Sequence, residues 1–397
     1  MMNFTLPLME DNITKDDINE LINFLNQDKI PKLTNGPKVL EFEKKWSEWL
    51  GVKYSLMVNS GASANELTML AIRHFIGTGQ IIVPPLTWIS DVASVLFAGL
   101  DLVFCDINLS NLSFDINKLK SLITKDTKAI FLTHVLGLNG LTDELLQLCK
   151  ENNILLIEDV CESHGATFKG KKVGSVGFAS NFSFYFAHHM STIEGGMICT
   201  DNDEFYQVCR ALRSHGMIRE MTDEKMKQSI IDENPHLNKD FIFLRPSHNF
   251  RSTEINAVLG MSQLRNLDSN NKKRVSNFKY FIDNLNKNIY ETNFSMDGQS
   301  NYAFIIILKK ASIDYRNHLE SVLRSNAIEF RRGLSGGGNQ MKQPFFKNTY
   351  TDDDHKNFPN VNHVHDFSWY VGNYPSLEKQ KIDYLLKVLN NAFNDFF

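Results

Sequence analysis

The stretch "KAIFLTHVLGLNGLTDELLQLCKENNILLIEDV", residues 128–160, sets two apolar runs on either side of a polar segment. The runs, residues 128–137 and 153–160, have the length of strands that are buried on both faces. The segment between them, residues 142–153, has the spacing of an amphipathic helix. A strand, a helix and a second strand in this order predict a mostly parallel sheet that is flanked by helices.

The same alternation continues on both sides of this stretch. Residues 38–51 have helical spacing and end at a glycine, residues 54–75 have the pattern of a strand, a glycine turn and a helix, and residues 100–107 form another apolar run. After residue 253 a long helical stretch leads into a shorter α+β pattern. We therefore expect an α/β fold with three parts: an N-terminal segment that packs on the body (1–35), a large domain (36–252) and a small C-terminal α+β domain (253–397).

Composition excludes several classes of protein. The 397 residues are enough for two domains, and 42 basic against 46 acidic residues give a net charge of −4, so no basic field favours nucleic acid. No apolar run reaches the roughly 20 residues of a membrane helix, and the first residues do not resemble a signal peptide. The five cysteines include no CxxC pair, so we expect no disulfide and no metal site, and we expect a cytoplasmic protein.

Polar residues at two predicted strand ends could hold a ligand. "NSGASAN", residues 59–65, lies where a strand passes into a helix, so its backbone N–H groups can either bind a phosphate or simply form a glycine turn with an N-cap. Asp159 lies at the end of the apolar run 153–160 and can pair with a protonated ring nitrogen. For its neighbour Glu158 we prefer the interpretation of a surface acid that caps a helix.

Three further residues have two interpretations each. Trp88 follows the short strand "IIVPP" and can stack on an aromatic cofactor or fill a core or interface. Ser183 in "NFSF" can bind a phosphate or remain a strand hydroxyl, and Asn249 in "HNFRSTEINAVLG" can bind a ligand or cap the long helix that follows.

The stretch "FSFYFAHHMSTIEGGMICT", residues 182–200, places two histidines between an aromatic run and a Glu-Gly-Gly turn. The run indicates a buried strand, and the turn indicates the start of the next strand. Adjacent imidazoles at such a junction can be surface residues, metal ligands or a device for proton transfer. The residues alone leave these three possibilities open.

Taken in order, these motifs resemble the DegT/StrS sugar aminotransferase family of fold-type-I pyridoxal phosphate enzymes, and the resemblance covers nearly the whole chain. It rests on "TNGPKVLEFEKKW", "VNSGASAN", "PPLTW", "IEDVCESHGA", "FSFYFAHHMSTIEGG", "HNFRSTEINAVLGMSQL" and "WYVGNYPSL". The resemblance implies an aspartate-aminotransferase-like large domain with a seven-stranded sheet, and it implies a homodimer. It also implies cofactor-binding roles for Gly61, Ala62 and Ser183 at the phosphate, Trp88 on the ring, Asp159 at the ring nitrogen, Glu162 near the phenolic oxygen, and Asn249 at the phosphate of the other subunit's cofactor.

His188 occupies the position at which ordinary family members carry the lysine that binds the cofactor covalently. With histidine in place of this lysine, the chain resembles the subgroup of 3-dehydratases that act on nucleotide-linked 4-keto-6-deoxysugars with pyridoxal or pyridoxamine phosphate. The resemblance implies that His188 acts as acid and base, that L-glutamate donates the amino group, and that His189 is a spacer. Because the cysteines lack the spacing of a cluster, we expect no iron–sulfur cluster.

Substrate contacts and the activity itself remain open to alternatives. We expect Arg331 and Asn339, in the glycine-rich stretch 331–345, to contact the nucleotide or sugar or else to belong to a flexible turn. His215 is a further candidate for substrate binding. The alternative functions are a nucleotide-sugar C4 aminotransferase that tolerates His188 and an inactive relative with a regulatory role.

Overall fold

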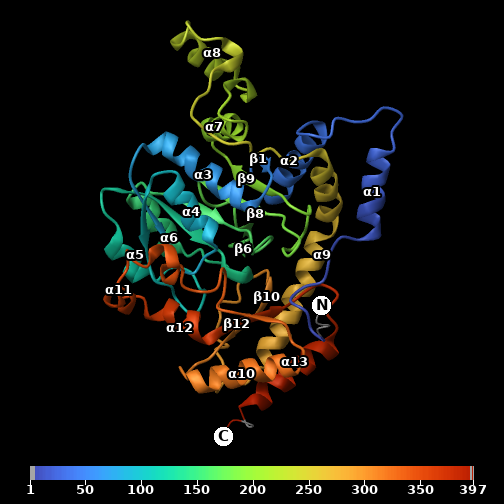
Figure 1. Ribbon diagram of the computed structural model, residues 1–397, viewed down its shortest axis with the longest axis vertical. Coiled ribbons are helices and arrows are strands. Elements are labelled where there is room, and N and C mark those ends of the chain that lie inside the picture. The colour runs from blue at the N-terminus through green and yellow to red at the C-terminus, as the bar shows by residue number, and fades with distance from the viewer. Residues whose placement is uncertain (1–4, 394–395, 397) are drawn as a thin grey trace.

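The computed structural model describes residues 5–393 and 396, and a seven-stranded sheet lies at its centre (Figure 1). The strand order is β1-β9-β8-β5-β4-β2-β3. The four pairs from β8 to β3 are parallel, whereas β9 runs antiparallel to both β8 and β1, so the mostly parallel sheet is confirmed. The strands are β1 (Tyr54–Val58), β2 (Gln80–Val83), β3 (Asp101–Phe104), β4 (Thr127–Thr133), β5 (Leu155–Asp159), β8 (Ala179–Ser183) and β9 (Gly196–Thr200).

Helices cover both faces of this sheet, which explains why its strands are continuous apolar runs. One face shares a buried core with α2 (Pro37–Leu50), α5 (Ile116–Leu122) and α6 (Asp143–Glu151). The opposite face packs against α3 (Gly61–Ile76), α4 (Ile89–Phe97) and α7 (Asp203–Arg213). A two-stranded hairpin of β6 (Thr167–Phe168) and β7 (Lys171–Lys172) lies outside the sheet.

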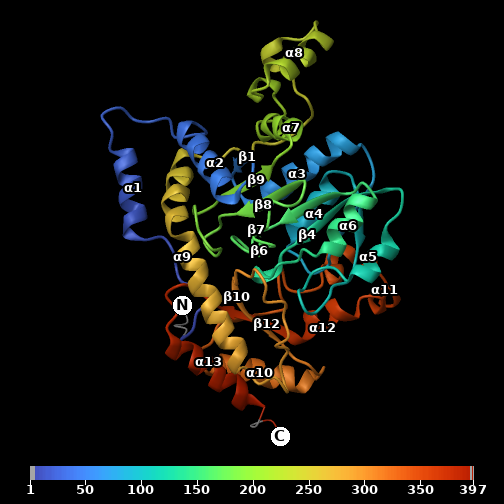
Figure 2. The same ribbon diagram turned by 180° about the vertical axis from the view of Figure 1, so that it is seen from behind.

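The long helix α9 (Glu254–Asn284) runs along the molecule from the large sheet to the C-terminal part (Figures 1 and 2). The Thr253 hydroxyl caps its start by accepting from the Asn256 N–H at 3.3 Å, so Asn249 is not the cap of this helix. The Glu254 carboxylate joins α9 to α2 by accepting from the N–H groups of Gly36, Lys38 and Val39. The helix α1 (Lys15–Leu25) packs against α9. The expected boundaries at residues 35 and 252 remain predictions.

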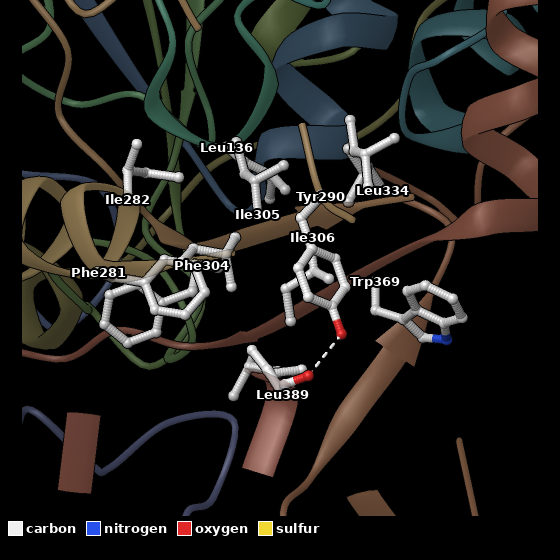
Figure 3. Packing of buried hydrophobic residues seen from close by; sticks show 14 of the residues in the cluster. Leu136, Phe281, Ile282, Tyr290, Phe304, Ile305, Ile306, Leu334, Trp369 and Leu389 are labelled. Carbon is white, nitrogen blue, oxygen red and sulfur yellow. Dashed lines mark hydrogen bonds between the residues drawn. The ribbon is translucent and has the colours of Figure 1, made fainter. Parts of the chain in front are cut away.

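A second core belongs to the C-terminal part and is drawn in Figure 3. Its antiparallel sheet has the order β10-β12-β11. Inside the core the Tyr290 hydroxyl donates to the Leu389 carbonyl oxygen at 2.9 Å, so the buried phenol has its polar atom paired. The elements are β10 (Ala303–Ile307), α10 (Ile313–Ser325), β11 (Phe330–Arg332), α11 (Asp352–Lys356), α12 (Pro359–Phe367), β12 (Ser368–Gly372) and α13 (Lys379–Ala392).

An arm after α7 projects from the body in both views (Figures 1 and 2). It carries α8 (Glu224–Glu233), which has no buried residue. No helix among the described residues is long and apolar enough to cross a membrane. Short 3₁₀ turns complete the chain: η1 (Val135–Gly137), η2 (Ile218–Glu220), η3 (Lys239–Phe241), η4 (Gln340–Lys342) and η5 (Pro344–Phe346).

Candidate active site

A cavity of about 670 Å³ opens at the edge of the sheet where the carboxyl ends of β1, β8, β5 and β4 meet. Ligands bind at this edge in open α/β sheets because the loops that follow the strands gather there. The C-terminal sheet supplies the opposite wall through Tyr302, Arg331 and Tyr370. The site therefore lies between the large sheet and the C-terminal part of the chain.

The phosphate-binding interpretation of "NSGASAN" fits the start of α3. Gly61 and Ala62 are the first residues of this helix and line the cavity, and their N–H groups precede the helix's own hydrogen-bond ladder. The Ser60 hydroxyl accepts from the Ser63 N–H at 3.0 Å and so caps the helix. A Cβ on Gly61 would lie 2.4 Å from the Cβ of Ser183, so only glycine lets the Ser183 hydroxyl approach this anion-binding helix end.

Two carboxyl groups follow β5 and line the cavity. Asp159 is 3% exposed, and its Oδ1 accepts from the Cys161 N–H at 2.8 Å while its Oδ2 accepts from Asn65 Nδ2 at 3.1 Å. Glu162 accepts from the Leu136 N–H at 3.0 Å. Burial, together with the nearby Asp159 carboxylate, raises the pKa of Glu162 to about 7. Glu162 can therefore hold a proton near neutral pH, whereas Asp159 is held in place by donors.

Trp88 stands at the rim of the cavity, directly before α4. Its side chain is 54% exposed, which excludes the core position that the sequence left open. An exposed indole in the cavity that the start of α3 also lines is suited to stacking on an aromatic ring.

His188 lies in the loop after β8, half-buried in the cavity wall. Its ring centroid is 5.6 Å from that of Tyr302 and 6.1 Å from that of His164. Burial lowers the pKa of His188 to about 4, with Asp159 opposing this shift and Arg274 adding to it. The imidazole is therefore neutral at pH 7, and its Nδ1 has no hydrogen-bond partner among the described residues. It can accept a proton from a molecule in the cavity.

His189 faces away from the cavity. It is 1% exposed, its Nε2 donates to the Ser300 carbonyl oxygen at 2.9 Å, and its ring stacks on His164 at 5.2 Å between centroids. Of the two histidines only His188 lines the cavity, and the roles of both remain predictions.

The remaining predicted residues are not all gathered at the cavity. Arg331 lines it and forms an ion pair with Glu329 at 3.3 Å. Asn339 is buried outside the cavity lining, where its Nδ2 donates to Asn362 Oδ1 at 2.9 Å and its Oδ1 caps η4. His215 and Asn249 are exposed and also lie outside the lining. The roles of these residues remain predictions.

Glu158 is not a surface acid, and our interpretation of it as a helix cap is wrong. It is 0% exposed and accepts from the N–H groups of Gly174, Val176 and Gly177, while its Oε2 lies 3.1 Å from His134 Nε2. Burial alone would raise the pKa of Glu158, but His134 and the backbone donors lower it below its usual value. Glu158 therefore stabilises the fold beneath Asp159.

Several cavity residues had no signal in the sequence. Tyr302 and Glu329 directly precede strands β10 and β11 of the small sheet, and Tyr370 of β12 reaches the site because it pairs in register with Arg331. Such a pairing between distant segments cannot be read from either segment alone. Tyr185, which the sequence placed within a buried strand, is 41% exposed and lines the cavity beyond the end of β8.

The fold is typical of an α/β enzyme with a phosphorylated cofactor. So are the free helix end at Gly61 and the buried Asp159 at the carboxyl edge of the sheet. The chain belongs to the DegT/DnrJ/EryC1/StrS aminotransferase family, whose sequence profile matches residues 11–390.

Named relatives agree with this membership. The chain is 33% identical over 369 residues to a GDP-4-keto-6-deoxy-D-mannose 3-dehydratase of Escherichia coli O55:H7. The matched region covers 90% of this chain and 92% of the relative. An enzyme of the same name from Yersinia pseudotuberculosis is 30% identical and covers 98% of both chains.

Solved structures agree as well. The E. coli GDP-4-keto-6-deoxy-D-mannose-3-dehydratase with bound hydrated PLP superimposes with a TM-score of 0.86 at 29% identity, covering 98% of this chain and 100% of that one. A structure of GDP-4-keto-6-deoxymannose-3-dehydratase with a trapped PLP-glutamate geminal diamine gives a TM-score of 0.85 at 29% identity, with 97% and 100% coverage. The fold is therefore that of these enzymes, which confirms the expected architecture.

Proposed function

We propose that the protein is a 3-dehydratase that uses pyridoxal or pyridoxamine phosphate to remove the C3 hydroxyl of a nucleotide-linked 4-keto-6-deoxyhexose. The product is a 4-keto-3,6-dideoxysugar. The single observation that carries this proposal is His188 in the cavity, where none of the described lining residues is a lysine. A family member without that lysine lacks the amine through which an aminotransferase binds its cofactor covalently.

The residues present fit the cofactor. The free helix end at Gly61 and Ala62, together with the Ser183 hydroxyl, suits its phosphate, and Asp159 suits a protonated ring nitrogen. Trp88 has the exposed area to stack on its ring. When bound, this group supplies the electron sink for breaking bonds next to the sugar's C4 carbon.

The chain's own groups then supply binding and proton transfer. Neutral His188 accepts a proton at an imidazole nitrogen and returns it later, and Glu162, with a pKa near 7, can hold a second proton. Arg331 presents a guanidinium to an anionic or hydroxyl-rich substrate at the far wall.

The partners follow from the same site. L-glutamate is proposed as the amino donor, which is supported by the PLP-glutamate adduct in a solved relative. The GDP-sugar in the names of the two relatives makes a GDP-linked substrate the first to test. We propose a homodimer, because Asn249 lies on the surface where a second subunit could use it. Five free cysteines support a reducing, cytoplasmic location.

The test is product analysis of the purified protein with L-glutamate and a panel of GDP-, CDP-, UDP- and dTDP-linked 4-keto-6-deoxyhexoses. A product that has lost the C3 oxygen supports the 3-dehydratase. A 4-amino sugar as the main product would instead identify a C4 aminotransferase. If neither forms with any nucleotide, the proposal of an inactive, regulatory relative replaces it.

A further inference from the structure

Asp91, on the first turn of α4, is a second carboxyl group beside Asp159 that the proposed chemistry does not use. It is 0% exposed and lies behind the cavity wall. Its Oδ1 accepts from Asn65 Nδ2 at 2.6 Å, and the same nitrogen lies 3.1 Å from Asp159 Oδ2. One amide therefore joins the two carboxyl groups.

The contacts on the other oxygen of Asp91 indicate where a proton sits. Asp91 Oδ2 contacts the hydroxyl oxygens of Thr87 and Thr133, and those two hydroxyl oxygens lie 2.7 Å from each other. If both threonine hydroxyls donate to Asp91 Oδ2, the contact between the two threonines is left without a hydrogen. A proton on Asp91 Oδ2 that is donated to one threonine closes a ring in which each of the three contacts has its own hydrogen.

The charges around Asp91 favour the same state. Burial and the Asp159 carboxylate raise the pKa of Asp91 well above its usual range, and they outweigh the hydrogen bonds from Thr87 and Thr133, which lower it. The other titratable group against it is Cys161, whose pKa is also raised by burial and by Asp159, so it stays a neutral thiol. Two adjacent carboxyl groups with no cation partner do not both ionise in a buried site.

We propose that Asp91 is a positioning residue that remains a neutral carboxylic acid and, through Asn65, holds Asp159 as the carboxylate that faces the ring nitrogen of the cofactor. The role of Asp159 at that nitrogen rests on the proposed function, whereas the protonation of Asp91 does not. An ionised Asp91 would compete with Asp159 for the Asn65 amide and would repel it. A neutral Asp91 leaves Asp159 with the charge and a fixed orientation.

Infrared spectra of the full-length, cofactor-free parent and its variants in heavy water, compared as parent minus variant, test the protonation of Asp91. At about pH 8.5, where Glu162 is ionised, the parent should show the carbonyl stretch of a buried protonated carboxyl. Asp91→Asn should remove this band. The matched control is Asp106→Asn, because Asp106 is equally buried but pairs with Lys118 at 2.9 Å, so that its loss should leave the band in place. A parent without the band, or a band that survives in Asp91→Asn, would overturn the proposal.

Titration with pyridoxal phosphate, followed by its visible absorbance, tests the positioning. Asp91→Ala should weaken binding about tenfold, because a donor network on a charged group is lost, and the neutral isostere Asp91→Asn should restore most of it. A merely structural role predicts equal losses in both variants. If the infrared band is found but no nucleotide sugar is deoxygenated, the proposed function fails and the protonated Asp91 stands. If a sugar is deoxygenated but the band is missing, the proposed function stands and the protonated Asp91 fails.

Discussion

The imidazole of His188 and the phenol ring of Tyr302 lie 5.6 Å apart between centroids, although one follows β8 of the large sheet and the other directly precedes β10 of the small sheet. His188 is therefore enclosed only when both parts of the chain have packed together. This enclosure is what desolvates His188 and keeps it neutral at pH 7. A neutral imidazole in a closed cavity is suited to take up a proton during the reaction.

Replacing His188 by alanine should therefore remove catalysis while sparing the fold. We expect C3 deoxygenation to fall by roughly 10²–10⁴-fold, the effect of losing a positioned acid–base group. Steady-state assay of the deoxygenated sugar measures this loss. The control is His318→Ala on α10, whose Nε2 donates to the Ala392 carbonyl oxygen outside the cavity walls, and which should retain activity. An alanine variant of His188 that works near the parent rate would show that another group is the base.

His188→Lys should change the chemistry in kind, because an amine at this position can bind pyridoxal phosphate covalently. Borohydride treatment followed by peptide mass analysis should find the reduced cofactor on residue 188 of the variant and on no residue of the parent. We expect deoxygenation to fall and a low level of amino transfer to the C4 ketone to appear. A reduced cofactor attached to any lysine of the parent would contradict the site as proposed.

Glu162 should make the cofactor-free protein less stable as the pH rises. The carboxyl group loses its proton near 4.5 in the unfolded chain and near 7 in the folded protein. Between these values the folded state binds more protons, so the free energy of unfolding falls with increasing pH. Glu162→Gln does not titrate, and its advantage over the parent should therefore grow from about pH 4 to about pH 8.

Urea unfolding across this range measures the effect. The control is Glu41→Gln, because Lys38 and Lys45 lower the pKa of Glu41 and the trend should have the opposite sign. An advantage of Glu162→Gln that does not change with pH would mean that the pKa of Glu162 is the same in the folded and the unfolded chain.

The sequence could predict what its local patterns encode. Continuous apolar runs such as 128–137 and 153–160 identified β4 and β5, because strands buried on both faces cannot alternate with polar residues. The glycine at position 51 ended α2 with a positive φ of 88°, as the helical pattern indicated. The predicted acid–base role of His188 came from the resemblance to a family and not from a local pattern, because no periodicity in a sequence marks a reactive imidazole.

The rest depended on contacts between distant segments. The run "FSFYF" leaves the sheet at Ser183, so Tyr185 turns to the cavity instead of the core. Glu158 and Asp91 are buried because donors from other segments surround them, and a single stretch of sequence does not show those donors. The helix α8 has no buried residue, and its apolar residues Met226, Ile230 and Ile231 are only partly buried against a small cluster within the arm, so the sequence does not show where the arm lies.

Glu158→Ala should destabilise the protein strongly. The change leaves His134 and three backbone N–H groups without their buried acceptor. Breaking such a pair from one side costs about 3–5 kcal/mol. The control is Asp203→Ala, which removes an exposed ion pair with Lys53 and should have little effect on stability. Chemical denaturation of both variants gives the comparison, and equal losses would mean that the buried network contributes little.

Complementation between two inactive variants tests whether the sites are shared across a homodimer. Asn249 is exposed and lies outside the cavity lining of its own subunit, so it can serve a site only in another copy of the chain. His188→Ala and Asn249→Ala should each be inactive alone. After mixing and subunit exchange, each heterodimer contains one site with both residues intact, and random pairing should restore about a quarter of the parent activity. His188→Ala mixed with His188→Ala/Asn249→Ala is the matched control and should stay inactive, because no site in it has His188. Activity that does not return in heterodimers verified by mass would place Asn249 outside the site.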